Sequence, residues 1–141
     1  MIFSVEETID APRETVWRYM TDPATMPDWM AGIENMRLAD GQSMGEGAEL
    51  LFAARGADRR STVATFAPPE TLVLRSVQGP VTATYRYTLT ADGAVTRASL
   101  QANCAAKGWM RLVMPLLRSM IRRVDGGQLK ALRDAMTART A

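Results

Sequence analysis

Two tyrosines in one expected strand are the groups of this sequence best suited to orient a ligand or to move a proton. Tyr85 and Tyr87 lie two residues apart in the segment Val81–Thr90, where apolar and polar side chains alternate. This alternation places both rings on the apolar face of a half-buried strand. A buried tyrosine needs a hydrogen-bond partner, so each hydroxyl either bonds a protein neighbour or points into a cavity and orients a ligand carbonyl or hydroxyl.

An arginine in the preceding strand is the second candidate for ligand contact. Arg75 interrupts the mostly apolar segment Thr71–Val77. If its side chain faces inward, its guanidinium can pair with an acidic ligand; if it faces outward, it lies solvated on the other face of the sheet. The strand register decides between these readings, and the sequence leaves both open.

The chain contains no histidine and one cysteine, Cys104. This composition excludes a Ser-His-Asp triad, a Cys–His pair and any histidine-ligated zinc site. Cys104 continues the alternation of Leu100 and Ala102, so we expect a small buried thiol. The sequence also lacks a glycine-rich phosphate loop and a zinc signature. We therefore expect neither a metal nor a cofactor, and no catalytic residue is assigned.

These side chains must be positioned by an α+β arrangement. A strand is expected over Ile2–Ile9, followed by two short helices that open at Pro12 and Pro23, because proline fits the first turn of a helix. The second helix is expected to reach Met30. Turn signals then separate six more segments typical of strands: Ile33–Ala39, Ala48–Ala54, Arg60–Phe66, Thr71–Val77, Val81–Thr90 and Val95–Cys104. Short connections favour antiparallel pairing of these strands.

From Gly108 onward the apolar residues recur at helical spacing. The stripe includes Met114, Leu117 and Ile121, while Pro115 is expected to kink the helix or to mark the start of its main body. Gly126-Gly127 is a second weak point. The helix is also basic, with Arg111, Arg118, Arg122, Arg123, Lys130, Arg133 and Arg139. Most of these cations are expected on a solvated face, although transient contact with a membrane or an acidic partner is a second use open to a basic amphipathic helix.

A sheet of seven strands must bury its apolar face, and the C-terminal helix is the only element long enough to cover it. We therefore predict one domain over residues 1–141, with the sheet curved around that helix. Tyr85, Tyr87, Met114, Leu117 and Ile121 are predicted to line a cavity between sheet and helix. A core filled by the tyrosines and methionines is the alternative that the pattern also allows.

The net charge and the distribution of apolar residues limit the expected partners and location of the protein. The net charge of +2 is too small to argue for nucleic acid. No apolar run approaches the roughly 18 residues of a membrane span. The N-terminus lacks the basic start and apolar stretch of a signal peptide, so the expected location is cytoplasmic. The oligomeric state, monomer or homodimer, stays open.

Several segments resemble one known family. They are Ile9-Asp10-Ala11-Pro12 with Val16-Trp17, Thr21-Asp22-Pro23 with Met26-Pro27-Asp28-Trp29, Gly45-Glu46-Gly47, Pro68-Pro69-Glu70-Thr71-Leu72, and the terminal amphipathic helix. In these segments the chain resembles the START-like (SRPBCC) superfamily, in particular its bacterial polyketide cyclase/dehydrase and lipid-transport type proteins. The resemblance implies a helix-grip fold with a deep apolar cavity. It also implies that Trp29 lies where the cavity entrance of the family would be. There Trp29 is either a gate or ligand contact, or a core or surface-anchoring tryptophan. The family shares no catalytic residue set, so none is carried over.

Three functions follow as hypotheses. The first is binding or carriage of a small lipophilic molecule such as a lipid, quinone, isoprenoid or polyketide-like aromatic. The second is an enzyme of the cyclase or dehydratase kind that works mainly by positioning its substrate, with a tyrosine or an inward carboxylate to handle protons. The absence of histidine argues against the enzyme without excluding it. The third is an interaction module whose cavity is incidental.

Overall fold

The structure is a computed structural model that describes residues 3–54 and 56–140. It contains one antiparallel sheet of seven strands in the order β1-β7-β6-β5-β4-β3-β2, which confirms the predicted sheet. The strands are β1 (Phe3–Ile9), β2 (Ile33–Leu38), β3 (Glu49–Ala54), β4 (Ala57–Ala67), β5 (Thr71–Gln78), β6 (Val81–Asp92) and β7 (Val95–Ala106). The predicted start of the first strand at Ile2 lies outside the described residues.

Tight turns join the long central strands β5, β6 and β7. Gln78 pairs with Val81 across Gly79-Pro80, and Asp92 pairs with Val95 across Gly93-Ala94. Gly79 and Gly93 have φ values of 58° and 65°. Such left-handed residues match the twist of two-residue hairpins, which explains why glycine stands at both turns. The hairpins fix the register that puts Tyr85 opposite Leu74 and Tyr87 opposite Leu72.

One of the two expected short helices forms as a full helix. It is α1, Arg13–Met20, with Pro12 directly before it. The segment after it is a turn followed by a single 3₁₀ turn, η1 (Met26–Asp28). Asp22 accepts a hydrogen bond from the backbone N–H of Ala24, and Thr25 donates one to the carbonyl of Tyr19. These local side-chain bonds compete with helical hydrogen bonds, so the predicted helix from Pro23 to Met30 does not develop.

The C-terminal segment is helical but divided. A 3₁₀ turn, η2 (Gly108–Val113), leads into α2 (Met114–Asp125), and α3 (Gln128–Thr140) follows after Gly126-Gly127. Pro115 lies in the first turn of α2, so it marks the start of that helix rather than a kink within it. None of the helices in the described ranges is both long and apolar enough to cross a membrane.

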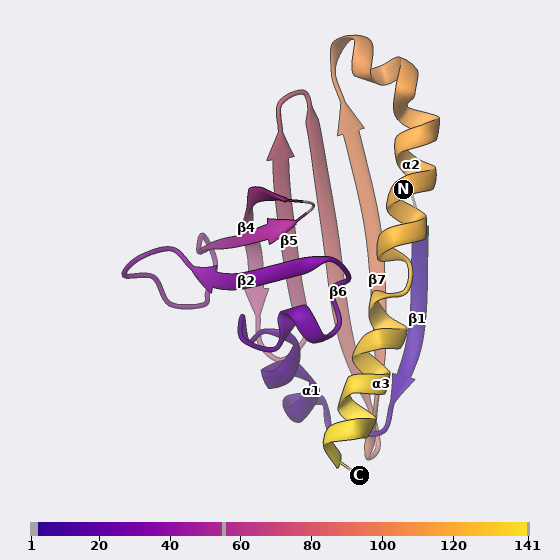
Figure 1. Ribbon diagram of the computed structural model, residues 1–141. Helices are drawn as coiled ribbons and strands as arrows, with labels where there is room; N and C mark the ends of the chain where they lie inside the picture. Colours follow the sequence, from indigo (N-terminus) through magenta and orange to yellow (C-terminus); the bar gives the residue numbers. More distant parts are fainter. Residues whose placement is uncertain (1–2, 55, 141) are drawn as a thin grey trace.

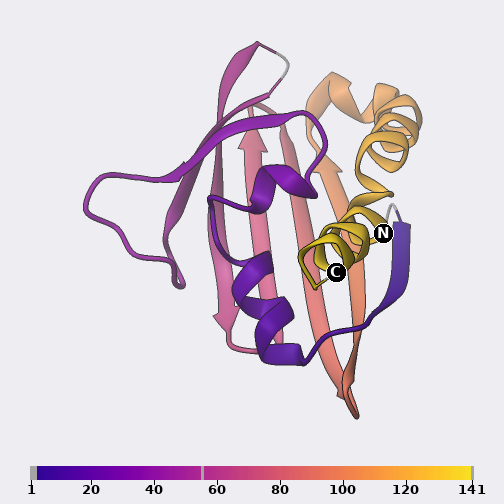
Figure 2. The ribbon, with the colours of Figure 1, turned by 60° about the horizontal axis from the view of Figure 1, so that its bottom comes forward.

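The sheet curves around α3, which lies across its concave face between β1 and the short helical segments (Figures 1 and 2). Leu129, Leu132 and Met136 of α3 are buried in the core with apolar residues of β1, β7 and α1. In contrast, α2 contributes one buried side chain, Met114. The helix that fills the concave face is therefore α3, and α2 covers the sheet without packing tightly on it.

Candidate functional site: a cavity under helix α2

A cavity of about 430 Å³ lies between the concave sheet face and the inner side of α2. Its sheet wall follows the strand alternation, with Leu74, Ser76 and Gln78 on β5 and with Val81, Ala83, Tyr85 and Tyr87 on β6. Its other walls come from β2, β3, β4 and from Leu117, Met120, Ile121 and Val124 of α2. Most of these side chains are apolar, and the volume falls in the range of small-molecule sites.

A polar cluster crosses this apolar cavity from the sheet to the α2–α3 junction. The Tyr85 hydroxyl donates a hydrogen bond to Asp125 Oδ2, at the end of α2. The Tyr87 hydroxyl donates to Gln128 Oε1 at 2.6 Å. Gln128 Nε2 in turn donates to Asp125 Oδ1 at 3.3 Å. All four side chains line the cavity, so a bound molecule would meet a connected set of polar groups on one wall.

The surroundings keep both phenols protonated. Burial raises the pKa of Tyr85, and the negative charge of Asp125 together with its hydrogen bond raises it further. Burial also raises the pKa of Tyr87, with a smaller contribution from Asp125. Both tyrosines are thus neutral hydrogen-bonding groups at ordinary pH.

Two further polar contacts lie on the part of the wall formed by β4 and β5. The hydroxyls of Ser61 and Ser76 are 2.6 Å apart, and Arg59 Nη1 donates to Gln78 Oε1 at 2.9 Å. These pairs face the cavity as well. Polar groups therefore occur at two places in a lining that is otherwise apolar.

The cavity is open to solvent on one side. Among its lining residues, Ala31, Gly32, Gln78 and Met120 are exposed, while Leu50, Leu74 and Tyr87 are buried. The exposed residues come from the loop after η1, the end of β5 and the middle of α2. The entrance is therefore bounded by the loop before β2, the end of β5 and the middle of α2.

Four of the seven residues predicted for the site line the cavity: Tyr85, Tyr87, Leu117 and Ile121. Trp29 is 1% exposed and does not line it, but its ring meets that of Tyr87 edge-on at a centroid distance of 5.5 Å. Its indole Nε1–H has no hydrogen-bond partner among the described residues. Trp29 thus supports the wall from behind.

The other two predicted residues point elsewhere. Arg75 is exposed, and its neighbours Leu74 and Ser76 are the ones that line the cavity. Because successive side chains of a strand face opposite sides, Arg75 lies on the convex face of the sheet. Met114 is buried at the start of α2 and is not a lining residue.

Sequence reasoning missed Asp125 and Gln128. A signal for Asp125 existed, because Leu117, Ile121 and Asp125 follow one another at spacings of four and so share one helix face. Gln128 comes after the Gly126-Gly127 break, so the direction of its side chain depends on how α3 is placed relative to α2. Only the structure shows that the break directs both side chains to the two tyrosines.

The other reactive side chains give less support for a nucleophile or a metal site. Burial raises the pKa of the Cys104 thiol, against a smaller opposite effect of Arg118, so a thiolate is not favoured. Within residues 3–54 and 56–140, no three His, Cys, Asp or Glu side chains are grouped so that they could hold a metal ion.

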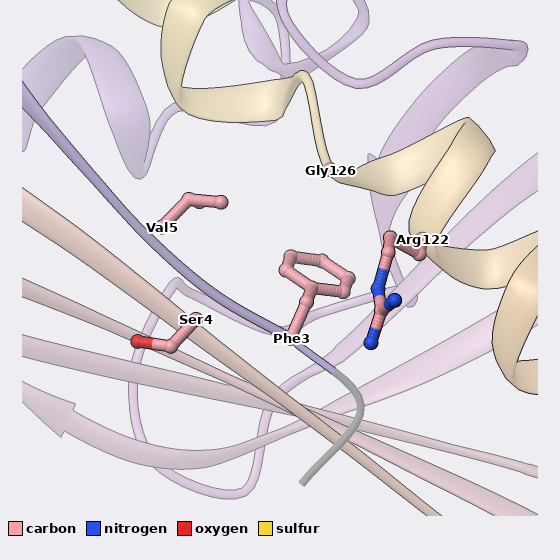
Figure 3. A pocket seen from close by; sticks show the side chains of 5 residues that line it. All are labelled: Phe3, Ser4, Val5, Arg122 and Gly126. Carbon is pink, nitrogen blue, oxygen red and sulfur yellow. The ribbon is translucent and has the colours of Figure 1, made fainter.

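A second hollow lies at the outer edge of the sheet, between β1 and the α2–α3 junction (Figure 3). Its lining consists of Phe3, Ser4, Val5, Arg122 and Gly126. The Phe3 ring and the Arg122 guanidinium lie next to each other, whereas Ser4 points away from the space between them. This hollow has no set of converging polar groups like that of the cavity under α2.

Solved structures share this fold over nearly the whole length of this chain. The chain matches the crystal structure of Ara h 8.0201 with a TM-score of 0.74 at 15% identity, covering 96% of this chain and 97% of that one. It matches a protein from Thermus thermophilus with a TM-score of 0.73 at 17% identity, covering 98% of both. The di-domain ARO/CYC protein StfQ of the steffimycin biosynthetic pathway matches with a TM-score of 0.73 at 11% identity, over 98% of this chain and 51% of that one. At these identities the matches show the fold alone.

The family itself is established from the sequence. No curated protein matches the chain. However, the family model described as polyketide cyclase/dehydrase and lipid transport matches residues 2–137, which is almost the entire chain. Together with the helix-grip arrangement of sheet and C-terminal helices, this match confirms the resemblance noted in the sequence. The chain belongs to the polyketide cyclase/dehydrase and lipid-transport family.

Proposed function

We propose that the protein binds a small, mainly apolar molecule in the cavity under α2 and carries or presents it. The observation that supports this proposal best is the cavity of about 430 Å³ with a largely apolar lining and one connected polar cluster. Burial of a ligand there would contribute about 0.8 kcal/mol for each CH₂ group removed from water. The family match, which includes lipid transport in its description, agrees with this function.

The lining also limits the chemistry of the ligand. A carboxyl group, an amide and two phenols line one wall, so a ligand that places one or two polar groups there gains orientation as well as burial. Carboxylate and amide oxygens accept hydrogen bonds, which favours a hydroxyl on the ligand at this wall. An elongated or fused apolar body with a single hydroxyl-bearing end, as in isoprenoid, quinol or aromatic polyketide compounds, fits this distribution.

Native mass spectrometry of protein purified from its own host tests the proposal. We expect a fraction of the wild-type protein to retain a small organic molecule, and the Leu117→Trp variant, whose indole would occupy the cavity, to retain none. A wild-type protein that carries no adduct, and that also gains none when incubated with a lipid extract of the host, would contradict the proposal.

A second candidate function is cyclisation or dehydration of a reactive chain held in the same cavity. The observation in its favour is the hydrogen bond between Tyr85 and the Asp125 carboxyl group inside the lining, because a carboxylate next to a neutral phenol can accept a proton from a bound substrate. The structural match to an ARO/CYC protein is in line with it. The same mass spectrometry distinguishes the two functions, since an added candidate substrate would be released unchanged by a carrier and altered by an enzyme.

A further inference from the structure

The outward side of η2 and α2 carries a stripe of large apolar side chains. Trp109, Leu112, Leu116 and Met120 follow one another at spacings of three, four and four residues, which places them along one side of the helical segment. Their exposed fractions are 70%, 84%, 74% and 39%. Among the described residues, Val77 is the only other large hydrophobic side chain that is comparably exposed. The exposed apolar surface is thus concentrated on this segment, which we call the apolar stripe.

The segment that carries the apolar stripe is also positively charged. Residues 107–124 include five cationic side chains and no acidic one, although the net charge of the whole chain is only +2. The cations are Lys107, Arg111, Arg118, Arg122 and Arg123. The nearest carboxyl group that follows, that of Asp125, accepts hydrogen bonds on the cavity side. A partner of this surface must therefore be both apolar and anionic.

The stripe is continuous with the cavity. Met120 belongs to the stripe and also lines the cavity entrance, and the inner face of α2 behind it lines the interior. Figure 1 shows η2 and α2 along the outer margin of the fold, and Figure 2 shows them next to the end of β7, on the side of the sheet where β1 lies. The segment can approach a flat surface without obstruction by α1 or η1, which lie at the opposite end of the molecule.

We propose that this basic segment docks on an anionic lipid bilayer, with the apolar stripe toward the membrane. Helices that lie in the membrane interface combine large apolar side chains with basic residues whose stems reach from the acyl boundary to the headgroups. Trp109 is the residue type found at the depth of the headgroups. No described helix is suited to cross the bilayer, so the segment would lie in its plane.

Two other partners, a second copy of the chain and an acidic protein, fit the apolar stripe less well than a bilayer does. A second copy of the chain would bring the five cations of each segment toward those of the other, which like-charge repulsion disfavours. An acidic protein would satisfy the charges but would need an apolar groove matched to one convex stripe. A bilayer supplies apolar depth and negative charge at once, and it places the entrance of the cavity at the surface where apolar molecules dissolve.

Co-sedimentation with vesicles tests the proposal. We expect wild-type protein to sediment with vesicles of phosphatidylcholine mixed with phosphatidylglycerol and to stay in solution with phosphatidylcholine alone. Binding should decrease as salt is added, because salt screens the attraction. Of the three tryptophans, Trp17 and Trp29 are buried, so a blue shift of the emission on vesicle binding would report Trp109 and should vanish in Trp109→Phe.

Paired variants separate docking from general effects of charge or exposure. Leu112→Glu with Leu116→Glu should reduce partitioning to anionic vesicles at least about tenfold. Val77→Glu changes an exposed apolar residue outside the stripe and should bind like wild type. Arg111→Gln with Arg123→Gln should weaken binding about 25-fold, at about fivefold for each arginine. Arg75→Gln, on the convex sheet face, is the matched control and should change little.

Several outcomes would overturn the proposal. These are absence of wild-type binding to either kind of vesicle, equal losses in the stripe variants and in their controls, or a concentration-dependent dimer that the double glutamate variant dissociates. The last result would assign the stripe to a second copy of the chain. Because vesicle binding is measured with no ligand added, its failure leaves the proposed cavity function standing, and the reverse also holds.

Discussion

A carboxyl group inside an apolar cavity is costly unless other groups hold it. Asp125 is the last residue of α2, where the partial negative charge of the helix end disfavours a carboxylate. Hydrogen bonds from Tyr85 and Gln128 oppose that effect, and Tyr87 orients Gln128 in turn. We infer that these four residues act as one unit, so that loss of any hydroxyl leaves a poorly solvated acceptor behind.

The two cavity tyrosines should make the protein sensitive to alkali. An unfolded tyrosine ionises near pH 10, whereas burial and the Asp125 charge raise the pKa of both Tyr85 and Tyr87 well above that value in the fold. Stability that is fully present below about pH 10 is therefore lost as the pH rises above it, by about 1.4 kcal/mol per pH unit for each tyrosine that stays protonated. Urea unfolding over a series of alkaline pH values measures this slope.

The variant Tyr85→Phe isolates one of the two contributions. At neutral pH it should lose about 1–3 kcal/mol, because Asp125 loses a buried donor. Above about pH 10 the stability of the variant should decline less steeply than that of wild type. The two slopes should differ by about 1.4 kcal/mol per pH unit. Parallel slopes for the two proteins would show that Tyr85 ionises normally in the fold.

For single residues, the sequence predicted which side chains share one face of a strand. It did not predict toward which side of the sheet that face points. Alternation in β6 correctly placed Tyr85 and Tyr87 together, since a strand has a strict period of two. The same rule could not tell on which side Arg75 lies, because that depends on the register between β5 and β6 set by the Gly79-Pro80 turn. The partners of the tyrosines come from about 40 residues further along the chain, beyond the reach of local patterns.

The break between α2 and α3 is the element that shapes the site. It lets α3 pack into the core while α2 passes over the cavity, and it brings Asp125 and Gln128 to the same wall. The glycine pair was recognised in the sequence as a weak point, but propensity alone does not say how the two helices are placed. Similarly, the expected helix after Pro23 failed because side-chain bonds of Asp22 and Thr25 close a turn there.

The two glycines of this junction should respond differently to alanine. A Cβ at Gly126 would clash with the backbone oxygen of Arg122, so Gly126→Ala requires the end of α2 to shift. We expect a loss of about 1–3 kcal/mol, as for other overpacked positions. Thermal and urea unfolding of the purified variant measure it.

Gly127→Ala is the matched control for that substitution. Apart from its chain neighbours, no described residue has an atom within 4 Å of a Cβ at Gly127, and the backbone of Gly127 is not left-handed. Alanine there restricts the unfolded chain and should stabilise the fold by about 0.4–1 kcal/mol. Equal effects of the two substitutions would contradict the described junction.

For the molecule as a whole, the concave face of the sheet is divided between a filled and a hollow part. Against β1 and β7 it is filled by Leu129, Leu132 and Met136 of α3. Against the strands from β2 to β6 it is left open beneath α2. The sequence predicted a sheet around a helix, but it allowed a filled core as readily as a cavity, because both use the same apolar pattern. Sheet curvature and the α2–α3 break, which act over the whole fold, decide between them.

Titration with an uncharged apolar fluorescent probe such as N-phenyl-1-naphthylamine tests the cavity most directly. Wild-type protein should bind about one equivalent of the probe saturably. Leu117→Trp should bind none, while it unfolds cooperatively and its stability stays within about 1 kcal/mol of wild type. Leu116→Trp, the same change on the outward face of α2, should bind the probe like wild type. A folded wild-type protein that binds no probe, together with a Leu117→Trp variant destabilised by about 1–3 kcal/mol, would show a filled core and contradict the account.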